Sequence, residues 1–95
     1  MSTITSLDIE ALAHACGARI DWVVQLVEVG IVEVSTTQPR EQWRFESHDL
    51  QAALRARRLE RDIGIHLEAA ALILDLEREV RRLKALLEVS TIGTR

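Results

Sequence analysis

The chain has 95 residues, of which 47% are hydrophobic and 3% aromatic, so we expect one domain over residues 1–95 around an aliphatic core. Its formal net charge of −3 argues against a dedicated nucleic-acid binder, because such proteins need a basic surface for the phosphates. The single cysteine, Cys16, excludes an internal disulfide and a cysteine-rich metal site.

Two short helices joined by a tight turn are predicted first. Asp8 is a favourable N-cap, and apolar residues recur after it at helical spacing until Gly17. A second helix follows and closes at Gly30. Its apolar face consists of Ile20, Val23, Val24, Leu26 and Val27. Two helices with a glycine in the turn between them indicate a helix-turn-helix.

A two-stranded wing is predicted after the second helix. Residues 31–34 form a short segment in which three of the four side chains are β-branched, which favours a strand. Residues 42–45 offer a second strand, with Trp43 and Phe45 on one face. Turn residues that include Pro39 lie between them. We expect Phe45 in the core, whereas Trp43 is either packed inside or exposed as an interface anchor. Strand, loop and strand after a helix-turn-helix indicate a winged helix.

Two further helices complete the chain. Ser47 is predicted to cap a third helix that runs to Asp62, and Gly64 breaks it, so the winged helix-turn-helix with its third helix covers residues 7–64. A long helix over residues 66–89 contains no glycine or proline. Its apolar positions alternate by fours and threes, as in a heptad seam. These positions are Ala69, Ile73, Leu76, Val80, Leu83 and Leu87.

The long helix requires a surface that covers its apolar side. A seam of roughly 20 residues has more apolar area than so small a domain covers alone. The helix therefore folds back on the winged part, pairs with its twin, or offers a groove to another protein. We predict a homodimer through this amphipathic, coiled-coil helix. The residues of the dimer helix are Ile73, Leu76, Val80, Leu83 and Leu87. On its outer face, Glu77 and Arg81 have the i,i+4 spacing of a supporting ion pair.

No catalytic, cofactor or metal site is predicted. His14, His48 and His66 fall on three different elements and share no motif with Cys16. The sequence also lacks a glycine-rich phosphate loop, a His-x-x-x-His pair and an acidic calcium loop. We expect Cys16 to be a small apolar residue at the end of an inward helix face. We therefore expect a protein that is not an enzyme and holds no cofactor.

Neither export nor membrane insertion is indicated. The first six residues lack the charged start and the apolar run of a secretory signal. The longest apolar stretches are far shorter than a membrane span. We therefore expect a cytoplasmic protein that does not enter a membrane.

The start of the second helix, with Trp22 among its residues, is where a helix-turn-helix reads DNA. Asp21 and Glu28 on this helix would repel phosphate. The DNA-binding candidates are therefore Arg19, Gln25, Arg40 and Arg44. Four arginines of the third helix either extend a phosphate patch or form a solvated face paired with acids. They are Arg55, Arg57, Arg58 and Arg61.

The order of elements and several sequence blocks resemble the CbpM chaperone-modulator family of the MerR-like class. The blocks are residues 26–33, residues 43–45, residues 55–65 and the Ala-Leu-rich helix that follows. The resemblance covers nearly the whole chain. Two positions depart from the family pattern: Arg19 stands where a Ser-like helix cap is expected, and Val34 where a proline is common.

The resemblance implies a mainly α fold, a MerR-like winged helix-turn-helix with a long C-terminal helix. It also implies a chaperone modulator that binds the J-domain of a CbpA-type co-chaperone and inhibits it, in competition with DnaK. Because J-domains carry a basic helix for DnaK, a competitor is expected to present carboxylates. The candidate partner-binding residues are Glu60, Asp62, Asp75 and Glu79. The alternative is a MerR-like DNA-binding transcription regulator.

Overall fold

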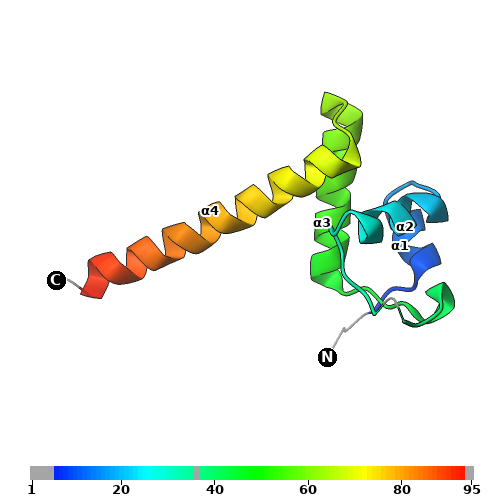
Figure 1. The fold of residues 1–95 in the computed structure, drawn as a ribbon, viewed down its shortest axis with the longest axis horizontal. Helices are drawn as coiled ribbons and strands as arrows, with labels where there is room; N and C mark the ends of the chain where they lie inside the picture. Colours follow the sequence, from blue (N-terminus) through cyan, green and yellow to red (C-terminus); the bar gives the residue numbers. More distant parts are fainter. Residues whose placement is uncertain (1–5, 36, 94–95) are drawn as a thin grey trace.

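The computed structural model describes the backbone of residues 6–35 and 37–93, and side chains as far as residue 89. The elements in chain order are α1 (Ile9–Ala15), α2 (Ile20–Glu28), the 3-10 helix η1 (Arg40–Gln42), α3 (Ser47–Arg58), the π-helix η2 (Leu59–Ile63) and α4 (Leu67–Gly93). The fold is therefore mainly α, as predicted. Helices α1 and α2 lie on one side of α3, and α4 leaves on the other (Figure 1).

The helix-turn-helix forms where it is predicted. The Oδ1 atom of Asp8 accepts a hydrogen bond from the backbone N–H of Ala11 at 2.8 Å, which caps α1. Between α1 and α2, Gly17 has a φ of +64°, a conformation that favours glycine. Arg19 is the N-cap of α2 and makes no side-chain capping bond. The departure at this position thus leaves the start of α2 without a side-chain cap.

The prediction of a wing is wrong, because no β-strand forms within the described residues. Gly30 and Ile31 instead close α2: their N–H groups donate to the carbonyls of Val27 and Leu26 at 3.1 and 2.9 Å. This is a Schellman closure, and it directs Ile31 into the core. Phe45 pairs with Leu7 in an isolated antiparallel bridge, with bonds of 2.7 and 2.8 Å.

The two aromatic residues of the segment predicted as a wing are both buried. Phe45 is fully enclosed, which confirms its place in the core, and Trp43 is buried beside it. Their rings meet edge to face with centroids 6.5 Å apart. The Nε1 atom of Trp43 donates to the carbonyl of Gln38 at 3.2 Å, so its polar atom is satisfied. Trp43 is therefore a core residue and not an exposed interface anchor.

The apolar core joins all four α-helices and the segment between α2 and α3. Its buried side chains are Ile9, Leu12, Ala13, Cys16, Trp22, Val23, Leu26, Ile31, Val32, Trp43, Phe45, Ala53, Ala56, Leu59, Leu67, Ala70 and Leu74. On α2 the buried face falls on Trp22, Val23 and Leu26, whereas Ile20 is exposed. Three small residues, Ala53 and Ala56 on α3 and Ala70 on α4, are fully buried in this core.

Helix α3 begins at Ser47, the residue predicted as its cap, and so one residue earlier than expected. Glu46, and not Ser47, is the N-cap, and its backbone N–H donates to Oδ2 of the buried Asp49 at 2.8 Å. The helix continues into η2 and stops at Gly64, whose φ is +76°. The N–H of Gly64 donates to the carbonyl of Glu60 at 3.1 Å. Gly64 thus ends the third helical segment as predicted.

Helix α4 projects from the rest of the molecule as an arm. It extends to Gly93, four residues beyond the predicted end at residue 89. The radius of gyration is 15.8 Å, against roughly 12 Å for a compact domain of this length. Only the first part of α4 packs on α3 and η2, and the arm accounts for the elongated shape (Figure 1).

Candidate protein-binding site

The largest exposed apolar surface lies on α4. Leu67, Ala70 and Leu74 are buried against the rest of the molecule, but every residue from 78 to 89 is exposed. We call Ile73, Leu76, Val80, Leu83 and Leu87 the arm seam. Of these, Ile73 is half-buried, and the other four are between 46% and 65% exposed.

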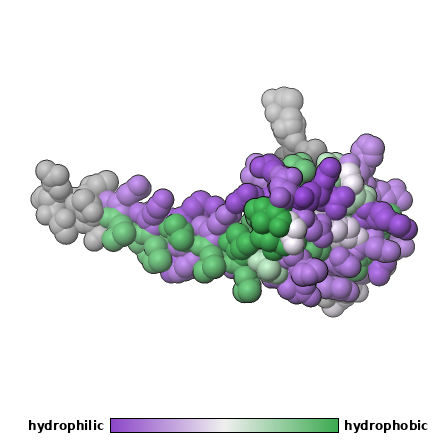
Figure 2. Space-filling model, turned by 90° about the horizontal axis from the view of Figure 1, so that it is seen from above, coloured by the Kyte–Doolittle hydropathy of each residue, from purple (hydrophilic) through white to green (hydrophobic). Residues whose placement is uncertain are grey.

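The arm seam faces away from the packed side of α4. A helix turns about 100° per residue, so residues spaced by three and four share a face. The buried residues Leu67, Ala70 and Leu74 form one such face, and the seam forms another, turned away from it. Figure 2 shows the resulting hydrophobic stripe along one side of the arm, with hydrophilic residues beside it. No other part of the described residues covers this stripe.

Glu60, a candidate partner-binding residue, already has partners within the chain. The Nε1 atom of Trp22 donates to its Oε1 atom at 2.8 Å, and Nη1 of Arg57 lies 3.3 Å from the same oxygen. Its side chain is only 29% exposed. Glu60 therefore ties η2 to α2 and α3 rather than standing free in solvent.

The other three carboxylates are solvent-accessible. Asp62 lies on η2 and forms no ion pair with another described residue. Asp75 and Glu79 lie one turn apart on α4, and each faces an arginine three residues on: Arg78 at 3.4 Å and Arg82 at 2.5 Å. The four candidates are thus divided between η2 and α4, with no contact among them.

The ion pair predicted between Glu77 and Arg81 is wrong. Glu77 instead accepts from Nη2 of Arg55 on α3 at 2.6 Å. This hydrogen bond lowers the pKa of Glu77 below its usual value, with desolvation acting in the opposite direction. The same bond raises the pKa of Arg55. The pair joins α3 to α4 about three turns after the start of α4, and sequence spacing gave no sign of it.

The four DNA-binding candidates do not form one surface. Arg19 and Gln25 line a hollow of about 580 Å³ beside the α1–α2 turn. Arg44 donates to the carbonyls of Glu41 and Trp43 in its own loop, at 3.1 and 2.8 Å. Arg40 begins η1, where the predicted wing is absent. In addition, Trp22 is buried, so it is not available at the surface of α2 for base contacts.

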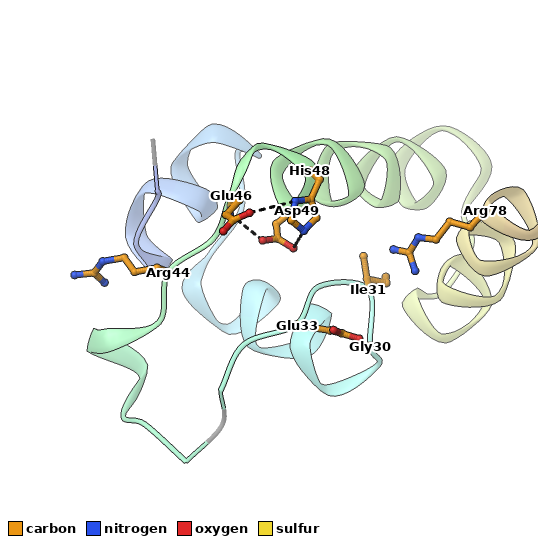
Figure 3. A pocket seen from close by; sticks show the side chains of 8 residues that line it. All are labelled: Gly30, Ile31, Glu33, Arg44, Glu46, His48, Asp49 and Arg78. Carbon is orange, nitrogen blue, oxygen red and sulfur yellow. Dashed lines mark hydrogen bonds and ion pairs between the residues drawn. The ribbon is translucent and has the colours of Figure 1, made fainter. Parts of the chain in front are cut away.

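A second hollow, of about 390 Å³, lies between α3, the end of α2 and the arm (Figure 3). His48 lies between Glu46 and Asp49, with N–O distances of 3.6 and 3.5 Å. Arg78 reaches toward this group from α4, whereas Arg44 points away. Asp49 is committed to capping α3, so the cluster serves local structure. Elsewhere in the described residues, no group of histidines, cysteines and carboxylates is arranged to hold a metal ion.

Cys16 is buried, as expected for a small apolar residue. Burial raises the pKa of its thiol, and the charge of Arg57 opposes this more weakly. The thiolate is the reactive form, so this environment disfavours a nucleophile. The three histidines are exposed on different elements.

Arg57 is the residue whose importance the sequence did not reveal. Its Nη2 atom donates to the carbonyl of Gly17 at 3.0 Å, and its Cζ atom lies 5.2 Å from the centroid of the Trp22 ring. Together with its contact to Glu60, these interactions join α3 to the α1–α2 turn. The sequence offered Arg57 either as a phosphate contact or as a partner of nearby acids such as Glu60, and it gave no sign of the contacts with Gly17 and Trp22.

Comparison with known proteins places this arrangement among regulators. The family model described as MerR HTH family regulatory protein matches residues 7–90. The chain is 35% identical to the chaperone modulatory protein CbpM of Pseudomonas entomophila strain L48, over 86% of this chain and 80% of that protein. It is 37% and 34% identical to the proteins of that name from Pseudomonas putida strains W619 and GB-1, with the same coverage. No helix among the described residues has the length and apolar character that a membrane span requires.

Proposed function

The chain belongs to the MerR HTH family of regulatory proteins, in the branch of the chaperone modulatory protein CbpM, and we propose that it binds and inhibits the J-domain of a CbpA-type co-chaperone. The family consists of regulatory proteins and not of enzymes, in keeping with the residue pattern. In the proposed mechanism, the bound modulator occupies the surface with which the J-domain engages DnaK. The interaction takes place in the cytoplasm.

In the proposed complex, carboxylates of this chain contact basic residues of the J-domain. Asp62, Asp75 and Glu79 are exposed carboxylates suited to the basic helix of a J-domain. Asp75 and Glu79 face arginines on their own helix, but exposed pairs of this kind contribute little and exchange partners readily. Glu60 remains in the proposed set with a different role, because a cation of the partner would compete with Trp22 and Arg57 for it.

A second copy of the chain is the proposed cover for the arm seam. Ile73 and Val80 alternate along it with Leu76 and Leu83, a combination typical of two-stranded coils. Full burial of a large aliphatic side chain contributes roughly 1.5–3 kcal/mol of stabilisation. Because the side chains of the arm seam are largely exposed in a single copy, most of this stabilisation is gained only when another surface covers them. Self-association through the seam keeps the carboxylates at its border available to the J-domain.

The observation that carries this proposal is the match to CbpM proteins over 86% of the chain, joined to an uncovered apolar arm with acidic borders. The direct test is calorimetry of the purified protein with a CbpA-type J-domain at two salt concentrations. We expect binding that weakens as salt rises. Absence of binding at low salt would overturn the proposal, and binding insensitive to salt would remove its electrostatic part.

Matched variants locate the contact. The triple variant Asp62→Asn, Asp75→Asn, Glu79→Gln is expected to bind the J-domain more weakly. The control triple Glu10→Gln, Glu33→Gln, Glu41→Gln changes the net charge equally at exposed positions outside the proposed site. If both triples weaken binding alike, net charge and not this site is responsible.

A DNA-binding regulator is the alternative function, and the helix-turn-helix with Arg19 and Gln25 beside one hollow favours it. Asp21 and Glu28, exposed on α2, oppose it. This alternative predicts a shift of promoter DNA with a steep salt dependence, lost in Arg19→Ala/Arg44→Ala. An unshifted promoter fragment would rule against it.

A further inference from the structure

We propose that a cationic groove beside the α1–α2 turn docks an acidic segment of a partner protein. Two hollows, of about 560 and 580 Å³, adjoin each other along Gly17 and Arg57, which line both. The first lies between the end of α1 and the end of α3, and the second runs along the start of α2. We call this surface the Arg57 groove.

The groove carries an excess of positive charge. Arg58 and Arg61 line its first part and Arg19 its second. None of these three guanidinium groups forms an ion pair or hydrogen bond with another described residue. Their donors are therefore available to an external carboxylate, which an arginine binds through two parallel hydrogen bonds.

Arg57 gives the groove a fixed centre. Its Nη1 and Nη2 atoms are held by Glu60 and by the carbonyl of Gly17, at 3.3 and 3.0 Å, and its guanidinium lies over the Trp22 ring. The Nε atom of Arg57 is buried and has no hydrogen-bond partner. A guanidinium anchored in this way loses little conformational freedom when a ligand binds, so the groove is preorganised.

An acidic protein segment fits the groove better than a nucleic acid does. Asp62 lies in the first part of the groove and Asp21 in the second. A nucleic-acid strand carries a phosphate about every 3.4 Å and would bring phosphates against these carboxylates. A peptide can place its acidic residues only at the arginines, and its apolar residues against Leu54.

Most of the Arg57 groove lies apart from the surface of the proposed function, but Asp62 borders both and Glu60 holds the central arginine of the groove. The groove lies on the α1–α2 side of α3, whereas the arm leaves from the other side (Figure 1). Its ligand is acidic, whereas the proposed J-domain contact is basic. The two ligands have opposite charge and are tested with different probes, so failure of one proposal leaves the other standing.

Trp22 provides the readout, because it lines the groove beneath Arg57. In the variant Trp43→Phe, Trp22 is the remaining tryptophan. This protein is titrated at low salt with a peptide alternating glutamate and leucine, with the same peptide carrying lysine for glutamate, and with a short DNA duplex. We expect a saturable change in Trp22 emission with the acidic peptide alone. No saturable binding of that peptide, or tighter binding of the duplex, overturns the proposal.

Two variants of the same protein test the location. Arg58→Ala/Arg61→Ala is expected to weaken binding of the acidic peptide roughly tenfold or more. Arg81→Ala/Lys84→Ala removes the same charge from exposed positions on the arm and is expected to leave the affinity unchanged. Equal losses in the two variants would overturn the assignment to this groove. Thermal unfolding of each variant verifies that it is folded.

Discussion

The indole N–H of Trp22 on α2 donates a hydrogen bond to a carboxylate oxygen of Glu60 on η2, 38 residues later, at 2.8 Å. The same oxygen faces Arg57 at 3.3 Å. One carboxylate thus satisfies a buried indole and balances a largely enclosed guanidinium. Glu60 therefore belongs to the structural framework even if a partner also reaches it.

Replacing Glu60 is expected to destabilise the fold. Glu60→Ala leaves the donors of Trp22 and Arg57 without an acceptor, which lowers the free energy of unfolding by about 1–3 kcal/mol. Glu60→Gln keeps an acceptor for the indole and is expected to lose less. Urea denaturation measures both, with Glu33→Ala, an exposed residue, as control. Equal stability of Glu60→Ala and the control would contradict this role.

A charge in the middle of the arm seam is expected to dissociate the proposed dimer. Leu83 is 46% exposed in the single chain, so Leu83→Asp leaves the core intact but desolvates a carboxylate in a paired arm. Light scattering should show a dimer for the parent protein and a monomer for the variant. Arg81→Asp changes an exposed residue away from the seam and should remain dimeric. A parent protein that is monomeric at all concentrations would refute the arm dimer.

The contact between Arg55 and Glu77 is expected to make stability depend on pH. The hydrogen bond from Arg55 lowers the pKa of Glu77 below its usual 4.5 in the folded chain. The pair therefore stabilises the fold above pH 4.5, and this contribution is lost as the pH falls through the lowered pKa. The difference in unfolding free energy between the parent and Glu77→Gln should be constant near neutral pH and shrink in acid. Glu41→Gln, at an exposed position, should show no such trend.

The thiol of Cys16 is expected to react slowly in the folded protein. It is buried, and desolvation raises its pKa, so little thiolate is present at neutral pH. Labelling with a thiol-specific reagent should be at least about tenfold slower in buffer than in concentrated urea. A native rate equal to that of the unfolded chain would show that Cys16 is accessible.

Signals that act within one helical turn predicted the helices well. Asp8 caps α1, and Gly17, Gly30 and Gly64 lie where helical segments end. These features depend on backbone geometry close to the residue itself, so the sequence reveals them. The common face of Trp43 and Phe45 was also visible as a pattern of period two, but that pattern predicted burial for Phe45 alone and left Trp43 open.

The wing failed because burial and strand pairing are different requirements. Ile31 and Val32 are β-branched and buried, but they reach the core through the turn that closes α2 and not as part of a hydrogen-bonded β-ladder. Phe45 takes Leu7 as its partner, from a distant part of the chain. The β-propensity of a residue reflects a preference for a half-buried surface, and it does not determine which segment of the chain pairs with it.

The side-chain contacts between different helices were less predictable, because they also depend on parts of the chain that are distant in sequence. The apolar spacing of the arm was legible, because it repeats along one helix. The partners of Glu77 and Glu60 were not, because they depend on how α4 and η2 meet α3 and α2. Helix spacing favoured Arg81 for Glu77, whereas the packing angle between the helices brings Arg55 closer. Contacts between elements require the tertiary arrangement that spacing alone does not contain.

The exposed stretch of α4 has a thermodynamic consequence. The side chains of residues 78–89 are exposed, so this stretch of α4 receives little tertiary packing from the described residues, and helices in proteins gain most of their stability from such packing. In the proposed dimer, the second copy supplies the missing packing. Folding of the arm and self-association then form a single mass-action equilibrium, so helix content and hydrogen-exchange protection are expected to rise together with protein concentration.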